Sequence, residues 1–528
     1  MKLARLWLLV LVSASLILSA CGGTSKPAAE GESVQEAVVA LPTDIVQLDP
    51  LDIGDAPSST VAAQIMEALV QRDENGNIQG ALAESWETSP DGRVWTFHLR
   101  QGVKFHDGSD FNAEVVKWHF DRILSDPDAP QRFRKQWSDI IEKVETPDDY
   151  TVVVTLKSPN AAFLDLVILT NAGMIWSKAN FEKLGAKEAA LHPVGTGPFI
   201  FESWEPGQKV VLKRNPDYWG GAPKLETLIF RPIAESNTQV IELETGGIHI
   251  ATKLGLEDVQ RLQNDPNVEV LTTPAYQVRF FTLNLKRPLM QDPAVRQALN
   301  YAFDRTSTIQ TLVGSMGVPS ESSVLPVASW AHPEKGSLPS YGYDPEKAKE
   351  VLLAAGYELK DGRLYRDGQP VEILFITPNG RYFGDREIAE VAKKAWEKVG
   401  FTVTLKVMEW APYLEEVQAG NYDVAVLGWN QSSPEPSIFF DPLVKTGGRA
   451  NYSGYSDPEL DEWLTQGVQT TDMAERKALY EKAAQRVEEN AWFVPLYNEM
   501  KVAGVRKEVK GYIHTPAFTR YNTIYIGK

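Results

Sequence analysis

The sequence contains a single cysteine, Cys21, among its 528 residues. A disulfide framework, a thiolate metal site and a cysteine nucleophile in the body of the chain are therefore excluded. The chain also lacks Gly-x-Ser-x-Gly and His-Glu-x-x-His motifs, and none of its seven histidines form the i, i+4 pair that binds zinc on a helix. These absences argue against a hydrolase and predict a protein with no catalytic residues, no cofactor and no metal site.

Basic residues are scarce relative to acidic ones, with 53 Lys and Arg against 70 Asp and Glu, which gives a formal net charge of −17. Nucleic-acid binding needs a basic surface that displaces counterions from phosphates, so this balance argues against nucleic-acid binding. With 43% hydrophobic and 10% aromatic residues, the chain has enough apolar surface for large cores. Its length exceeds what one core supports, which predicts several domains.

Long apolar runs are also lacking after the first 20 residues. At the start of the chain, Lys2 and Arg5 form a short positive region before an apolar run from Leu6 to Ile17, a pattern typical of a signal peptide over residues 1–20. The run ends in Leu-Ser-Ala-Cys-Gly, which resembles the cleavage box of bacterial lipoproteins and implies lipidation of Cys21. Small polar residues then predict a lipidated flexible tether over residues 21–33. We therefore expect an extracytoplasmic protein anchored to the cell membrane by lipid, in the periplasm or on the outer face of the plasma membrane.

Strand and helix patterns alternate along the rest of the chain, which predicts an α/β fold. β-branched and aromatic residues predict strands over residues 94–99, 150–156, 209–213, 371–376, 401–407 and 422–427. Asp-Pro pairs, with Asp as the cap and Pro in the first turn, predict helices that begin after Asp292, Asp344 and Asp457. An apolar stripe predicts another helix between Gly384 and Gly400.

Two groups of residues have a structural interpretation that we prefer to a functional one. The sequence Gly195-Thr196-Gly197-Pro198 superficially resembles a phosphate loop but lacks the Lys and Ser/Thr that follow in such loops. Tyr218 and Trp219 are interpreted as packing residues rather than ligand contacts. Neither group predicts a nucleotide site.

Six blocks of the sequence, taken together and in order, carry a resemblance. They are residues 82–108 (with Leu-Ala-Glu-Ser-Trp-Glu and Gly-Val-Lys-Phe-His-Asp-Gly), 194–199, 215–219, 295–301, 343–348 and 423–429. These blocks resemble the family 5 extracellular solute-binding proteins, which are the dipeptide, oligopeptide and nickel receptors of ABC importers. The resemblance extends from about Val38 to Tyr497.

The resemblance implies a two-lobe, type II periplasmic-binding-protein-like clamp of the α/β class, with an extra subdomain in lobe one. Lobe one would have its core in residues 34–60, 191–282 and 493–528, and its extra subdomain in residues 61–190. Lobe two would comprise residues 283–492. Two hinge crossings, at residues 281–285 and 493–496, would let the lobes close over a ligand held between them.

The resemblance also implies ligand-binding residues. In peptide-binding members an aspartate pairs with the ligand amine, an arginine pairs with its carboxylate, and tryptophans line the cleft. The matching positions here are Arg381, Tyr382, Trp410, Trp429, Asn430, Gln431 and Ser432. Ser432 stands where the amine-binding aspartate is expected, and a buried ammonium without a carboxylate partner is unfavourable.

The function that follows is capture of a peptide or peptide-like solute and its delivery to the permease and ATPase subunits of an ABC importer, by a monomer without nucleic-acid partners. Two other ligand classes stay open within the family, a nickel or metallophore complex and an oligosaccharide. Two other functions, a ligand-sensing lipoprotein and a secreted hydrolase, are the alternatives outside it.

Overall fold

The computed structural model describes residues 35–322, 324–431, 433–516 and 519–527. The predicted signal peptide, the tether with Cys21, and Ser432 lie outside the described residues. Strands and helices alternate along the described chain, which confirms the predicted α/β class. Within the described residues, no helix has the length and hydropathy required to cross a bilayer.

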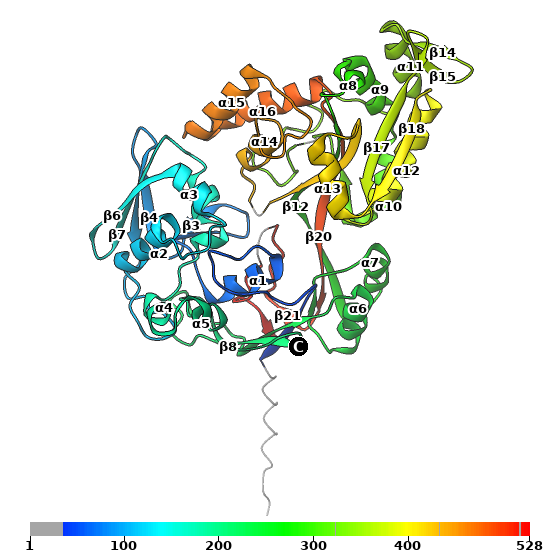
Figure 1. Cartoon of the computed structure of the whole chain (residues 1–528). Coiled ribbons are helices and arrows are strands. Elements are labelled where there is room, and N and C mark those ends of the chain that lie inside the picture. Colours follow the sequence, from blue (N-terminus) through cyan, green and yellow to red (C-terminus); the bar gives the residue numbers. More distant parts are fainter. Residues whose placement is uncertain (1–34, 323, 432, 517–518, 528) are drawn as a thin grey trace, which may run out of the picture. The chain divides into compact units, whose positions relative to one another are not determined.

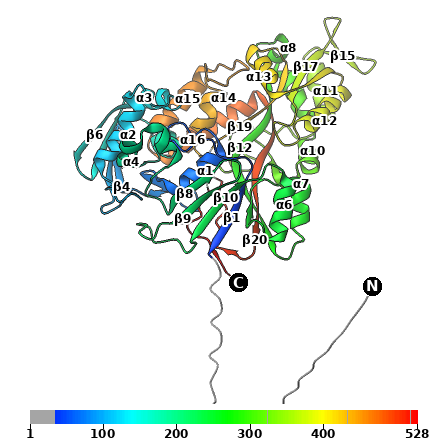
Figure 2. The same ribbon diagram turned by 60° about the horizontal axis from the view of Figure 1, so that its bottom comes forward.

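A sheet of 11 strands forms the centre of the described chain (Figures 1 and 2). Its order is β18-β17-β19-β12-β20-β11-β1-β10-β9-β8, and β13 pairs with β20. The bounds of its strands are β1 Glu36–Leu41, β8 Phe199–Glu205, β9 Lys209–Arg214, β10 Thr227–Pro232, β11 Ile250–Ala251, β12 Val268–Leu283, β13 Gly317–Pro319, β17 Glu372–Pro378, β18 Thr402–Met408, β19 Val424–Asn430 and β20 Phe493–Arg506.

The strands β12 and β20 connect the two parts of this sheet. They lie side by side as an antiparallel pair, visible in both views (Figures 1 and 2). One end of β12 pairs with β19, whereas the opposite end of the pair meets β11 through β20. Their register shifts between Pro274 and Val278, so the backbone is irregular at the point where Tyr276 lies.

A second sheet has the order β4-β5-β7-β6 and is separate from the central one. Its strands are β4 Ala83–Thr88, β5 Val94–Leu99, β6 Ile141–Asp148 and β7 Thr151–Leu156, and the helices α2 Ala113–Ser125 and α3 Arg134–Ile140 belong to the same region. Phe97, Phe120 and Trp137 are among the buried residues of the core that these elements share.

The smaller sheets pair β2 Val70–Arg72 with β3 Ile78–Gly80, β21 Val509–Lys510 with β22 Tyr525–Ile526, and β15 Arg363–Arg366 with both β14 Glu358–Lys360 and β16 Gln369–Pro370. The remaining α-helices are α1 Ala56–Ile65, α4 Lys178–Leu184, α5 Ala186–Leu191, α6 Ser236–Thr245, α7 Leu256–Leu262, α8 Pro288–Gln291, α9 Pro293–Tyr301, α10 Arg305–Leu312, α11 Pro345–Ala354, α12 Asp385–Lys398, α13 Trp410–Ala419, α14 Ser437–Leu443, α15 Pro458–Gln469 and α16 Met473–Glu489. Three short helical turns are η1 Leu164–Ile168, η2 Asn171–Gly173 and η3 Gly314–Met316.

Hydrophobic cores cover both faces of the central sheet. Adjacent residues of a strand point to opposite faces, so they enter different cores. On β12, Phe281 packs into one core and Phe280 into another. The same alternation on β1 sends Val39 and Val38 to two further cores. This arrangement explains why residues 37–41 of β1, which has parallel neighbours on both sides, form a continuous apolar run.

The structure confirms the predicted helix starts. The carboxylate of Asp292 accepts a hydrogen bond from the Ala294 amide at 2.9 Å, and that of Asp344 accepts one from Lys347 at 2.9 Å. Asp457 accepts from two amides at the start of α15. Each of these helices therefore begins with at least one of its unpaired amides satisfied, as the Asp-Pro pattern predicts.

Candidate ligand-binding site

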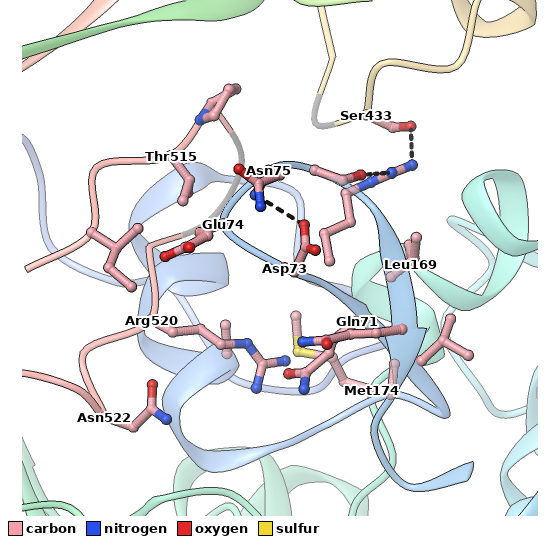
Figure 3. Close-up of a pocket in the computed structure, with 18 of the residues that line it drawn as sticks. Gln71, Asp73, Glu74, Asn75, Leu169, Met174, Ser433, Thr515, Arg520 and Asn522 are labelled. Atoms are coloured by element: carbon pink, nitrogen blue, oxygen red, sulfur yellow. Dashed lines mark hydrogen bonds between the residues drawn. The ribbon is translucent and has the colours of Figure 1, made fainter. Parts of the chain in front are cut away.

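A cavity of about 450 Å³ lies beside the β2–β3 hairpin and the C-terminal segment (Figure 3). It is lined by residues from 63–79, 169–174 and 513–523, together with Tyr276 and Ser433. Its volume falls in the lower part of the range of about 300–1,000 Å³ typical of small-molecule pockets. Its wall is mixed, since Met66, Leu169 and Met174 are apolar while other lining residues carry charge.

The turn between β2 and β3 contributes Asp73 to the wall. Its carboxylate accepts hydrogen bonds from the amides of Asn75 at 2.9 Å and Asn77 at 2.8 Å. The Asn77 side chain also donates to it, and these hydrogen bonds hold the pKa of Asp73 below its usual value. The Asp73 carboxylate is thus hydrogen-bonded within its own turn.

Arg72 and Ser433 lie close together in the cavity wall. Arg72 forms an ion pair with Asp165, a nearly buried carboxylate on η1. The Ser433 hydroxyl donates to the same Asp165 and lies 3.4 Å from Arg72 Nη2. Because Ser433 follows β19, this cluster joins the loop after β19 to the region of the second sheet.

Glu67 lies behind the cavity wall and is completely buried. Its carboxylate accepts hydrogen bonds from Thr196 Oγ1 at 2.9 Å, Tyr218 Oη at 2.7 Å and Trp219 Nε1 at 2.8 Å. Burial, followed by the neighbouring Glu67 charge, raises the pKa of Tyr218 far above its usual value. Tyr218 therefore stays protonated and keeps donating to Glu67.

The glycines around Thr196 explain how it reaches Glu67. A Cβ on Gly195 would lie 2.0 Å from the carbonyl oxygen of Ile65, and one on Gly197 would lie 2.7 Å from it. The backbone of this motif packs directly on the end of α1, which a side chain would prevent. The Gly-Thr-Gly sequence is thus a close-packing motif, in agreement with the structural interpretation given above.

Arg520 enters the cavity from the C-terminal segment (Figure 3). Its Nη1 lies 3.7 Å from Glu67 Oε1, and its side chain is 28% exposed. Its guanidinium forms no hydrogen bond with another described residue, and its ion-pair partner is Glu67. The Glu67 charge therefore compensates Arg520 without using its donors.

Three of the predicted ligand-binding residues lie together and do not line this cavity. Arg381 is exposed and its guanidinium carbon lies 4.7 Å from the ring centroid of Trp410. Tyr382 packs edge-on against Trp410, with ring centroids 6.0 Å apart. On the other side, Tyr382 lies under Arg279, whose guanidinium carbon is 4.8 Å from its ring centroid.

The predicted residues at the end of β19 and in the loop after it contact different parts of the protein. Asn430 accepts a hydrogen bond from Arg279 at 2.7 Å, which places it near Tyr382. The Gln431 amide donates to the Tyr276 carbonyl at 2.9 Å, next to the cavity. Trp429 donates from its indole to the Ile438 carbonyl at 2.7 Å and lies under Arg449 rather than Arg381. None of these described residues lines the cavity, and their role in binding stays a prediction.

Glu435, in the same loop, is buried beside Arg476 with an oxygen–nitrogen distance of 2.7 Å. Burial raises the pKa of Glu435, while the Arg476 charge opposes that shift. Arg476 also donates to the Gly467 carbonyl at 2.7 Å. The Glu435 carboxylate is therefore paired with a buried arginine of the same chain.

Glu67 and Arg520 are not among the binding residues predicted from the sequence. Glu67 carries a signal that was available, because it is a lone carboxylate within the apolar run Ile-Met-Glu-Ala-Leu-Val. A charged residue at such a position needs a buried partner. Arg520 carries no comparable local signal, and only its position beside Glu67 distinguishes it.

No cluster of three or more His, Cys, Asp or Glu side chains suited to a metal ion occurs in the described part of the chain.

Residues 77–451 match the model of the family described as bacterial extracellular solute-binding proteins, family 5 (middle). The glutathione-binding protein GsiB of Escherichia coli O1:K1 / APEC is 32% identical over 520 residues, covering 96% of both chains.

Solved structures are similar over nearly the whole length. HbpA2 from Haemophilus parasuis aligns with a TM-score of 0.85 and 27% identity, covering 93% of this chain and 100% of that one. DppA from Helicobacter pylori, in complex with the peptide STSA, aligns with a TM-score of 0.75 and 30% identity, covering 93% and 98%. These similarities confirm the predicted two-lobe, type II binding-protein fold. The chain belongs to the family 5 bacterial extracellular solute-binding proteins.

Proposed function

We propose that this chain captures a short peptide outside the cell membrane and delivers it to the permease and ATPase subunits of an ABC importer. The observation that supports a short peptide is the cavity of about 450 Å³, with apolar and charged residues on its wall. Such a wall suits a ligand that has both side chains and charged termini. Relatives named for glutathione and a neighbour with bound STSA agree with this ligand class.

Binding is tested by offering the purified mature protein several ligand classes under identical conditions. The set comprises glutathione, trialanine, the nickel complex of histidine and maltotriose, measured by calorimetry. We expect at least one of the two peptides to bind with a dissociation constant of about 10 µM or lower. The nickel complex belongs in the set because NikZ from Campylobacter jejuni, bound to Ni(L-His), aligns with a TM-score of 0.74. Binding of the nickel complex or the sugar without peptide binding would overturn the proposal.

The ligand-binding motion is proposed to occur about residues 281–285 and 493–496. The support is that these residues lie where β12 and β20 pair, with Thr282 opposite Phe493. Lobe one, with residues 34–60, 191–282 and 493–528 and its subdomain 61–190, would then close on lobe two, residues 283–492. Small-angle scattering with saturating peptide is expected to report a smaller radius of gyration. An unchanged radius would count against this hinge.

We also propose that lipid at Cys21 anchors the chain to the membrane. The support is the lipoprotein-like box around Cys21 and the signal-peptide pattern before it. The variant Cys21→Ser is expected to move from the detergent phase to the aqueous phase on detergent partitioning. A Cys21→Ser protein that still partitions with detergent would contradict the anchor.

A further inference from the structure

Two arginines line the cavity, and their surroundings differ. Arg72 is paired with the nearly buried Asp165, and it also donates to the Gly76 carbonyl. Its charge and its donors are therefore already used within the protein. Arg520 lies 3.7 Å from Glu67, beyond hydrogen-bond length, and has no hydrogen-bond acceptor among the described residues.

The reason Arg520 keeps its donors is that other groups satisfy Glu67. Thr196, Tyr218 and Trp219 donate three neutral hydrogen bonds to that carboxylate. Arg520 thus contributes charge compensation from the cavity wall, and no hydrogen bond to another described residue uses its N–H donors. Figure 3 shows the Arg520 side chain extending into the cavity on the side away from Ser433.

A guanidinium on a pocket wall without an internal acceptor matches a planar anion, because arginine and carboxylate form two parallel N–H···O bonds. Asp73 and Glu74 also line the cavity, but Asp73 is held by the amides of its own turn. Glu74 is exposed at the tip of the hairpin. Because Arg72 is paired with Asp165, Arg520 is the arginine of the cavity wall that is best placed to bind an anionic group of a ligand.

We propose that Arg520 binds a carboxylate of the ligand and that Glu67 positions Arg520 for this contact. The inference rests on the proposed function and narrows its ligand class to peptides with a free carboxylate facing the Glu67 side of the cavity. In such a complex the guanidinium donates to the ligand carboxylate, while Glu67 keeps its three neutral donors. This assigns the carboxylate contact to a residue other than Arg381.

Calorimetry with matched ligands isolates this contact. The probes are glutathione, its glycine amide, its γ-glutamyl α-amide, and trialanine as free acid and as amide. In the wild-type protein, amidation of one carboxylate is expected to weaken binding by about thirtyfold or more, because a charge-assisted pair in a partly desolvated site is lost. The two glutathione amides distinguish which carboxylate Arg520 contacts.

The variant Arg520→Gln is expected to weaken binding of the free acid by a similar factor and to bind acid and amide equally. Arg520→Lys keeps the charge but loses the planar fork, so an intermediate preference is expected. The double variant Glu67→Gln/Arg520→Gln removes the uncompensated Glu67 charge and is expected to show the same loss of preference. Arg381→Ala serves as the comparison, and it is expected to retain the acid-over-amide preference.

The outcomes separate the two proposals. If wild type binds peptide acids and amides equally, or if Arg520→Gln retains the preference, the assignment of Arg520 is wrong and the peptide-receptor function stands. If Arg381→Ala alone abolishes the preference, the carboxylate contact belongs to Arg381. If wild type binds neither glutathione nor trialanine, the proposed function fails and the inference fails with it. Melting temperatures of the ligand-free variants that lie well above the assay temperature show that folding is not the cause.

Discussion

The cavity wall and the segment of residues 433–443 both bury carboxylates beside other charged or polar groups, but they satisfy them differently. Glu67 is surrounded by three neutral donors, and its arginine lies at 3.7 Å. Glu435 contacts Arg476 directly at 2.7 Å, and both side chains are almost fully buried. Asp441, on α14, has a buried Oδ1 with no hydrogen-bond partner among the described residues.

The difference teaches how a protein can present an arginine to a ligand. When a buried carboxylate contacts its arginine directly, the arginine becomes part of the internal structure. When neutral groups satisfy the carboxylate, the arginine is still attracted by the charge but retains its donors. The pair of Glu435 and Arg476 is of the first kind, and Glu67 with Arg520 is of the second.

The largest effect is expected for Arg476→Ala. This change leaves Glu435 buried without its counter-charge, and breaking such a pair lowers the free energy of unfolding by about 4 kcal/mol. Urea denaturation at pH 7 measures the loss. The neighbouring Lys477→Ala is the matched control, because the Lys477 side chain is 41% exposed, and it is expected to stay within about 0.5 kcal/mol of wild type. A small effect of Arg476→Ala would show that the pair is less desolvated than the structure indicates.

A smaller loss is expected for Glu67→Gln. A carboxamide offers one oxygen in place of two, so at least one donor among Thr196, Tyr218 and Trp219 loses its acceptor. The expected reduction in the free energy of unfolding is about 2 kcal/mol, measured by the same denaturation. Glu84→Gln is the control, since the Glu84 side chain is 58% exposed. If Glu67→Gln were as stable as wild type, the three hydrogen bonds would not be the main support of this carboxylate.

Replacement of Asp441 is expected to raise the free energy of unfolding, whereas the two changes above lower it. Burial raises the pKa of Asp441 to about 6 from the ordinary 3.8. The native state therefore binds this proton more tightly than the unfolded state, and the resulting stability is present below pH 3.8 and lost as the pH rises through about 6. Asp441→Asn removes this dependence and is expected to raise the free energy of unfolding at pH 7.5 by about 1 kcal/mol.

Denaturation of both proteins at pH 5 and pH 7.5 checks this expectation. The difference between Asp441→Asn and wild type is expected to be larger at pH 7.5 than at pH 5. Glu462→Gln, at an exposed carboxylate on α15, is expected to show no such change. A difference that is equal at the two pH values would mean that Asp441 titrates near its ordinary pKa.

Much of the fold could be predicted from the sequence, because it depends on local pattern. The segment 94–99 was predicted as a strand and is β5, since its alternating apolar residues bury one face. The helices after Asp292, Asp344 and Asp457 begin as predicted, since a cap acts within one turn. The family blocks added the two-lobe fold, which the similarity to solved structures confirms.

The predicted ligand-binding residues stay a prediction. Arg381, Tyr382 and Trp410 do lie together, as neighbours around α13, but they do not line the cavity. Trp429, although it follows them in the predicted set, packs against Ile438 and Arg449 instead. Ser432 lies outside the described residues.

The sequence by itself determined the α/β class, the helix starts and the family, because each depends on neighbouring residues or on blocks read in order. The tertiary structure alone decided that Glu67, Thr196, Tyr218, Trp219 and Arg520 form one cluster. These residues are separated by up to several hundred positions, so no local periodicity relates them. Their association depends on the close packing of Gly195 and Gly197 on α1 and on the return of the C-terminal segment to the cavity wall.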